Sequence, residues 1–491
     1  MQPEETLNSK ESYWLTRFVF QRFLAFIYLI AFLVAANQFV PLLDEKGLLP
    51  VPLFLKRVEF WDAPGLFWLH PTDGFFTGLA WAGALLSALA LTGLSESFGI
   101  LISAGIWFLL WLFYLSFVNV GQVFYGFGWE SLLLESGFLA IFLGSSDTAP
   151  PKRIIWFLRW VVFRLMFGAG LIKIRGDACW RDLTCMMYHY ETQPIPNPLS
   201  WYFHQLSPAV QKGSVLFTHF VEIVLPGGLF VPGLVGYLAG FFTILFQFTL
   251  ILSGNLSWLN YLTIALCVSC FDDRLLRHLV PIKASETKPL GFLRKGILTM
   301  LTVLILVLSI QPAVNLFSPG QLMNASFEPL HLVNTYGAFG SVTKERNEII
   351  LEGTSNERPG PETKWLAYEF KCKPGDINAT PCVMSPYHYR LDWLLWFAAM
   401  SDYRHYPWLL NLIAKLLQND PLTLSLIKSN PFPGEPPKYI RAEYYRYRFT
   451  SPEEKKKTGR HWGRVKIGEY LPPLSLEHPQ FRKILEEQKW L

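Results

Sequence analysis

Charged residues are scarce in this sequence. Asp, Glu, Lys and Arg account for only 16% of the 491 residues, whereas hydrophobic residues account for 51% and aromatic residues for 16%. A soluble chain usually carries about 25% charged residues, so the composition predicts a membrane protein rather than a series of soluble domains. The net charge of +5 is small and spread along the chain, and it gives no support for a nucleic-acid partner.

Several motifs of soluble enzymes are missing. We find no G-x-S-x-G nucleophile elbow, no Walker A loop, no G-x-G-x-x-G after a strand and no H-E-x-x-H zinc motif. Hydrolysis by a known catalytic triad and the use of nucleotides are therefore unsupported. The first residues, "MQPEETLNSKESYWLTR", also lack the positive start and the cleavage site of a removable signal peptide, so the first apolar run is expected to remain as an anchor.

Long apolar runs dominate the first two thirds of the chain. Because backbone polar groups must be satisfied inside a bilayer, a run of about 20 apolar residues predicts a membrane-spanning helix. We therefore expect a polytopic α-helical membrane domain over residues 18–317, with about nine spans. The fourth and eighth spans are short or polar, so the count is approximate. The predicted spans are 18–42, 75–94, 98–118, 129–144, 154–174, 214–231, 234–253, 256–271 and 297–317.

The basic residues predict the orientation, because Lys and Arg in connecting segments are retained on the cytoplasmic side. The connection 272–296 is the most basic, and it indicates that this side and the N-terminal segment 1–17 lie in the cytosol. Nine spans then place the loops 44–74 and 175–213, together with the C-terminal portion 318–491, outside the cytosol.

The C-terminal portion, residues 318–491, has the pattern of a folded extramembrane domain. Residues 391–420 show helical spacing that is interrupted near Pro407. Four stretches alternate in the manner of strands and are rich in aromatic and β-branched residues. We expect an α+β or β-rich domain docked on the membrane. The four stretches are 348–353, 364–372, 439–450 and 463–470.

Cysteines and glycosylation motifs bear on the same question of sidedness. Cys372 and Cys382 flank a Pro/Gly turn segment, where a short disulfide-closed loop is expected in an oxidising compartment. The N-x-[ST] motifs at Asn324 and Asn378 are glycosylation candidates on the same side. The C-x-x-C at 267–270 has no second pair and no His partner, so we expect it to pack in the core rather than bind zinc.

Charged and polar side chains inside the predicted spans should face the protein interior, since they are costly in lipid. We expect Arg164 of the fifth span to pair with Glu130 or Glu135 of the fourth. His219 and Glu222 lie one helical turn apart in the sixth span. The residues expected to form one buried polar network are Glu130, Glu135, Arg159, Arg164, His219 and Glu222.

Lys173 stands about one turn inside the outer end of the fifth span. One interpretation is snorkelling, in which the amine reaches the interface while its aliphatic stem stays in lipid. The other is a lysine in a low-dielectric pocket that acts as a general base. The residues alone leave both open.

The loop that follows Lys173 carries further polar chemistry. His189 and Glu191 would share a face on a strand and could begin a metal site. Two ligands do not make a site, however, so a hydrogen-bonded interface is favoured, and we expect neither a metal nor a cofactor. Cys179 and Cys185 lie in the same loop and either form a disulfide or remain apart.

Seven ordered blocks rich in Trp, Tyr and Cys carry a family resemblance. They are "VNVGQVFYGFGWESLLLESGFLAIFL", "GLIKIRGDACWRDLTCMMYHYETQPIPNP", "SGNLSWLNYLT", "HLVNTYGAFGSVTKER", "EFKCKPGD", "SPYHYRLDWLLWFAAM" and "PPLSLE". Together these blocks resemble the lipase maturation factor family, from about residue 12 to residue 477.

The resemblance implies a multi-pass membrane protein of the endoplasmic reticulum with a lumenal C-terminal domain. Members of that family act as folding factors rather than enzymes: they help secreted homodimeric lipases of the lipoprotein lipase type to fold, to dimerise and to be secreted in active form. On this interpretation the lipase clients meet the outer loop and the aromatic surface of residues 330–400. The client-binding candidates in the loop are Tyr188, His189, Tyr190, Glu191 and Trp201.

The membrane core is also distantly similar to the vitamin K-dependent gamma-carboxylase superfamily, because Gly170, Lys173 and Trp180 match its G-x-x-K followed by Trp. This similarity implies that Lys173 is a base, and it predicts a cavity lined by Lys173 that is large enough for a lipid or quinone. The His/Tyr-rich span of the carboxylases is replaced by "GWESLLLESGF". A channel or transporter would use the membrane charges instead, but no internal repeat supports one.

Overall fold

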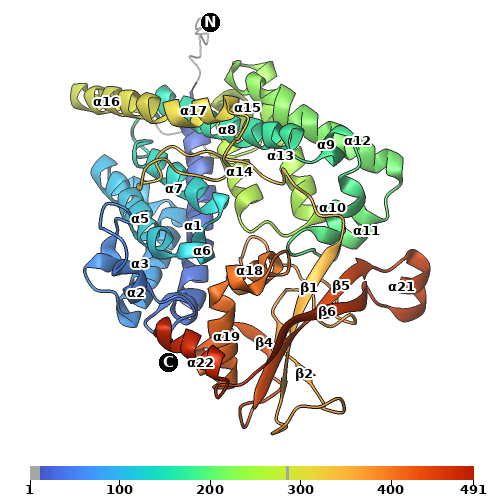
Figure 1. Cartoon of the computed structure of the whole chain (residues 1–491). Coiled ribbons are helices and arrows are strands. Elements are labelled where there is room, and N and C mark those ends of the chain that lie inside the picture. Colours follow the sequence, from blue (N-terminus) through green and yellow to red (C-terminus); the bar gives the residue numbers. More distant parts are fainter. Residues whose placement is uncertain (1–11, 283–286, 491) are drawn as a thin grey trace, which may run out of the picture.

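The computed structural model of the chain describes residues 12–282 and 287–490. Most of the predicted N-terminal segment 1–17, and Lys283 of the basic connection, lie outside the described residues. The described chain forms a helical bundle and a C-terminal domain built on a twisted sheet, packed against one end of the bundle (Figure 1).

Seven helices of the described chain are long and apolar enough to cross a membrane. The fifth of them begins as an α-helix and continues through a π-helical turn, η2, and a 3-10 turn, η3; the last is bent between two α-helices. Their elements are α1 (Trp14–Leu43), α3 (Asp73–Thr92), α5 (Ile100–Val120), α8 (Lys152–Arg175), α12 (Pro208–His219) with η2 (Phe220–Val224) and η3 (Leu225–Phe230), α13 (Leu234–Ser253), and α16 (Phe292–Leu308) with α17 (Ile310–Phe317).

Two shorter helices occupy the positions of the fourth and eighth predicted spans. They are α7 (Gly128–Ile141) and α14 (Leu259–Cys267), which continues into η4 (Val268–Cys270). All residues of α7 except Phe138 and Ile141 are buried, and α14 contacts α1, α7, α8 and α13. A helix enclosed by protein needs neither the length nor the apolar surface of one that faces lipid, which explains why these two runs are short and polar.

The remaining helices are short and lie in the connections. Those before the C-terminal domain are α2 (Val51–Leu55), η1 (Leu66–Trp68), α4 (Leu94–Ser97), α6 (Gln122–Tyr125), α9 (Ala178–Arg181), α10 (Met186–Thr192), α11 (Ser200–His204) and α15 (Asp273–Leu276).

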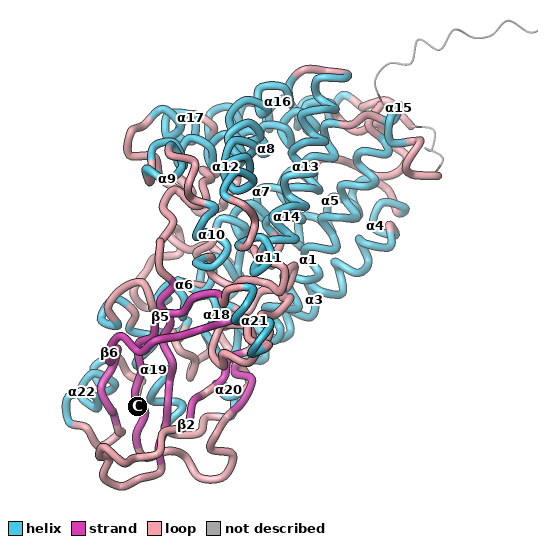
Figure 2. Tube along the Cα trace, turned by 90° about the vertical axis from the view of Figure 1, so that its right-hand side faces the viewer, coloured by secondary structure: helices cyan, strands magenta, loops and turns pink. Residues whose placement is uncertain are grey.

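The connections gather at two ends of the bundle. At one, which we call the α15 end, the Asp273 carboxylate accepts hydrogen bonds from the backbone N–H groups of Trp14 and Leu15, and the Trp14 indole donates to the carbonyl of Ser146. The opposite end, the domain end, carries the C-terminal sheet. Figure 2 shows α4 and α15 at one end and the strands at the other. The polytopic helical fold predicted from the sequence is confirmed.

The C-terminal domain is built on a four-stranded antiparallel sheet in the order β2-β1-β5-β6. Strands β3 and β4 form a small second sheet. Each of the four predicted stretches contains at least one strand: β1, then β2 with β3, then β5, then β6. The elements are β1 (Arg346–Thr354), β2 (Leu366–Ala367), β3 (Glu369–Phe370), α18 (Arg390–Ala398), η5 (Tyr403–His405), α19 (Pro407–Leu417), α20 (Pro421–Leu424), β4 (Ile427–Ser429), β5 (Tyr439–Phe449), α21 (Pro452–Thr458), β6 (Trp462–Leu474) and α22 (Pro479–Glu487).

The C-terminal domain is fastened to the bundle by buried hydrogen bonds. The amide of Gln38 in α1 donates to the carbonyl of His388 at 2.7 Å and accepts from the backbone N–H of Arg390 at 3.0 Å. The Asn411 amide of α19 donates to the carbonyls of Gly47 and Leu48. Buried polar groups that found no partner would cost free energy, so these bonds fix the position of the domain on the bundle.

Candidate functional site

Lys173 forms a buried ion pair. Its Nζ lies 2.7 and 2.8 Å from the two carboxylate oxygens of Glu222, which belongs to the π-helical turn η2. Gly170, one turn earlier on α8, allows this approach, because a Cβ there would lie 2.7 Å from Ile223 Cγ1 and 3.0 Å from Glu222 Cβ. The Trp180 ring covers the ammonium, with its centroid 5.4 Å from Nζ.

This geometry contradicts the snorkelling interpretation of Lys173 and gives the amine a structural partner. The side chain is buried, so it does not snorkel to an interface. The amine donates to both oxygens of the Glu222 carboxylate, so its polar contacts are made inside the protein. The chamber that Lys173 lines has a volume of only about 60 Å³, which is far smaller than the 300 Å³ or so at which ligand pockets begin.

Glu135 is the partner of Arg164. The two side chains form a buried ion pair, and the Arg164 guanidinium also donates to the carbonyl of Asn334. Glu135 accepts further hydrogen bonds from the side chains of Asn334 and Tyr336 at 3.1 and 2.7 Å. The segment before β1 is thereby tied into the membrane bundle.

Glu130 pairs instead with Arg390, the first residue of α18. The guanidinium Nη1 lies 2.7 Å from Glu130 Oε1 and donates to the carbonyl of Phe124 at 2.6 Å. The Arg390 guanidinium stacks 3.5 Å over the Tyr125 ring, and the Tyr114 hydroxyl donates to Glu130. This ion pair joins the bundle to the C-terminal domain.

Of the remaining two members of the expected network, Arg159 lies apart, whereas His219 lies beside the Lys173 ion pair. Arg159 donates to the carbonyl of Ser269 at 2.9 Å and to the Tyr13 hydroxyl at 3.3 Å. His219 Nε2 lies 3.0 Å from the carbonyl oxygen of Trp180. The structure therefore separates the six residues into distinct clusters, one at Glu135 and one at Glu130, with Arg159 held by neutral groups. Glu222 and His219 lie together at Lys173 and Trp180.

The outer loop after Lys173 is an internal support and carries a disulfide between Cys179 and Cys185. Three of its five client-binding candidates, His189, Tyr190 and Trp201, are buried. The Trp201 indole donates to the carbonyl of Thr450. Tyr188 and Glu191 are half-buried.

His189 and Glu191 do not share a face, because residues 186–192 form the helix α10 rather than a strand. The Glu191 carboxylate accepts from the backbone N–H of Phe449 at 2.5 Å, and its burial raises the pKa of that carboxyl. Burial lowers the pKa of His189 to about 4. Within residues 12–282 and 287–490, no group of three or more His, Cys, Asp or Glu side chains is placed to hold a metal ion.

Sequence reasoning missed the residues that bind this loop to the sheet. Arg346 of β1 donates to the carbonyls of Glu191 at 3.0 Å and Pro194 at 2.9 Å. It pairs with Glu348, which also pairs with Lys373. A partial signal was present, since Arg346 stands two residues before Glu348, the first residue of the predicted stretch 348–353, and the two share one face once the strand begins at Arg346.

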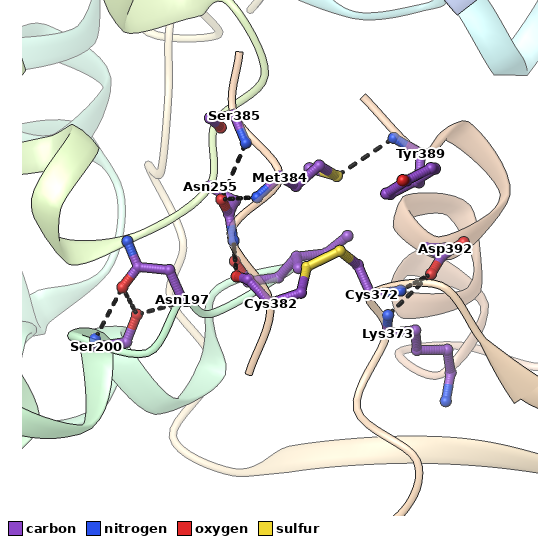
Figure 3. The surroundings of a disulfide bond; sticks show 11 residues. Asn197, Ser200, Asn255, Cys372, Lys373, Cys382, Met384, Ser385, Tyr389 and Asp392 are labelled. Carbon is purple, nitrogen blue, oxygen red and sulfur yellow. Dashed lines mark hydrogen bonds between the residues drawn. A yellow bond between two sulfur atoms is a disulfide. The ribbon is translucent and has the colours of Figure 1, made fainter. Parts of the chain in front are cut away.

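The second disulfide joins Cys372 and Cys382, as the turn segment between them predicts. Asn255, in the connection before α14, donates to the carbonyl of Cys382 and accepts from the backbone N–H groups of Met384 and Ser385 (Figure 3). Asn255 is thus buried, and both its amide nitrogen and its amide oxygen form hydrogen bonds. By contrast, the glycosylation candidates Asn324 and Asn378 are exposed on the surface.

Comparisons with known proteins identify the family. A family model described as the lipase maturation factor transmembrane domain matches residues 15–278, and one described as the lipase maturation factor C-terminal domain matches residues 332–472. No solved structure matches.

Individual relatives match over nearly the whole chain. Lipase maturation factor 1 of Homo sapiens is 46% identical over 510 residues, covering 96% of this chain and 90% of the relative. Lipase maturation factor 1 of Bos taurus is 44% identical, with coverage of 98% and 92%. Lipase maturation factor 2 of Xenopus laevis is 30% identical, with coverage of 96% and 84%. The chain therefore belongs to the lipase maturation factor family.

Proposed function

We propose that the protein acts in the endoplasmic reticulum membrane as a folding factor that helps secreted lipases of the lipoprotein lipase type to fold and assemble as homodimers. The observation that carries the proposal is the similarity to proteins named lipase maturation factor 1 over 98% of the chain. The buried hydrogen bonds between bundle and domain support it, since they give the domain end a fixed surface for a client.

The protein works without catalysis. The ion pair with Glu222 engages the amine of Lys173 inside the protein, and this supports a structural role for the residue. Holding a partly folded chain requires an exposed apolar surface instead.

We place the domain end in the lumen. The described basic residues of this connection are at the α15 end, which suits the cytosol; they are Arg274, Arg277, Lys288, Arg294 and Lys295. Both disulfides and the two exposed glycosylation motifs lie in chain segments at or beyond the domain end, which suits an oxidising compartment.

We further propose that clients contact an apolar face within the outer loop, at α11. Leu199, Tyr202 and Leu206 are 43%, 56% and 37% exposed. This face adjoins the C-terminal domain, because the Gln205 amide donates to the carbonyl of Thr450. Client contact thus falls beside the buried Trp201 rather than on it.

The role of Lys173 is tested by removing the ion pair as a unit. In cells that lack their own lipase maturation factor, Lys173→Met/Glu222→Leu should restore lipase activity per unit lipase mass to nearly the wild-type level. Lys173→Met alone leaves a buried carboxylate without a partner, which costs about 3–5 kcal/mol, and should lower both the amount of protein and the rescue. A double variant present at wild-type amount that gives no rescue would instead assign chemistry to Lys173.

The orientation is tested by glycosidase treatment of the protein expressed in cells with a secretory pathway. Asn378→Gln and Asn324→Gln should each remove one glycosidase-sensitive mass shift, whereas Asn255→Gln should remove none because Asn255 is buried. Wild-type protein that is unmodified at both exposed sites, together with protease sensitivity of the C-terminal domain from the cytosolic side, would contradict the proposal.

The client surface is tested by a photocrosslinking amino acid at Tyr202, with the same group at Trp61 as the control. Trp61 is 76% exposed in the loop 44–74 and lies away from the apolar face. A co-expressed lipase should crosslink to position 202 several-fold more than to position 61. Equal crosslinking at both positions would contradict this surface.

A further inference from the structure

A second cavity, of about 570 Å³, opens beside the chamber of Lys173 at the domain end. Its walls come from the start of α7, the last turn of α8, the segment 319–343 and α18. Most of the lining is apolar, including Phe127, Trp129, Ile172, Met323, Trp396 and Phe397. The volume falls within the range of about 300–1,000 Å³ that is usual for small-molecule sites.

The cavity and the chamber share walls. Leu165, Leu256, Leu259, Ala338 and Phe339 line both, as does His189. An apolar chain entering the larger space would therefore end against the covered Lys173 ion pair. Most of the combined lining is apolar, which suits a hydrocarbon chain.

Two polar groups in this lining are poised for a ligand. Arg175 lines the cavity and is exposed; it donates to Gln321 Oε1 at 2.7 Å and to the carbonyl of Leu316 at 2.8 Å. Both acceptors are neutral, and among the described residues no carboxylate forms an ion pair with Arg175, so its charge is uncompensated. His189 is 93% buried, and its Nδ1 has no hydrogen-bond partner in the described chain.

We propose that this cavity binds a single-chain anionic amphiphile, a long-chain fatty acid, with its hydrocarbon chain among the apolar walls and its carboxylate at Arg175. One uncompensated guanidinium matches one carboxylate. The Nδ1 atom of His189 is a second polar atom in the lining. It is buried without a hydrogen-bond partner, and buried polar atoms usually have one. The site is separate from the client surface and does not depend on the identity of the client.

The test measures binding of radiolabelled palmitate to the full-length protein in lipid nanodiscs, with empty nanodiscs as the background. Gly320 lines the cavity, and a Cβ there would meet only Ser318 Oγ, at 4.0 Å. Because Gly320 lines the cavity, Gly320→Phe should narrow it and lower the affinity at least tenfold. Gly78→Phe, a matched change on the exposed surface of α3 with no atom near its Cβ, should bind like the wild type.

The head group is tested with palmitate methyl ester as a competitor. The wild type should prefer the acid by about tenfold, since hydrogen bonds to charged groups contribute about 1.5–3 kcal/mol. Arg175→Gln should remove this preference while keeping the affinity for the ester. Equal competition by acid and ester on the wild type would overturn the assignment of the carboxylate to Arg175.

A photoactivatable fatty acid keeps the proposal testable if a variant fails to fold. On the wild-type protein, the label should fall on peptides containing residues 319–343 or 393–400. Palmitate that shows no saturable binding above empty nanodiscs, or label confined to the lipid-facing helix α16, would overturn the proposal.

Discussion

The ion pair between Glu130 and Arg390 is the constraint on which the arrangement of the two parts of the molecule depends. Both side chains are almost fully buried, and their charged groups are 2.7 Å apart. A buried charge whose partner is removed costs about 3–5 kcal/mol. Neither charge is satisfied unless the C-terminal domain sits on the bundle, so the pair makes misplacement of the domain costly.

The other buried contacts extend this arrangement. Glu135 gathers Arg164, Asn334 and Tyr336, which ties the segment before the sheet to α7 and α8. Arg346 then binds the sheet to the outer loop. The polar residues that follow α8 are thus largely internal, and they join the bundle to the C-terminal domain.

The architecture could be predicted from the sequence because it depends on local patterns. Apolar runs predicted the helical bundle, and alternation of residue types predicted β1, β5 and β6. The turn segment between Cys372 and Cys382 predicted their disulfide. The partner of Glu130 could not be predicted, because Arg390 lies 260 residues away and nothing local indicates that it turns inward. The spacing of His189 and Glu191 would put both side chains on one face only if the segment were a strand. The segment is the helix α10, so the spacing carries no information about a shared site. The cavity, too, depends on segments distant in the sequence that only the tertiary fold brings together.

The central claim is that bundle and C-terminal domain form one cooperative unit held by buried charges. Hydrogen exchange of the protein in nanodiscs, followed by mass spectrometry at increasing denaturant, tests it most directly. The account predicts that peptides from β1 and β5 lose protection at the same denaturant concentration as those from α7 and α8. Loss of protection in the strands at a clearly lower concentration, with α7 and α8 still protected, would contradict it.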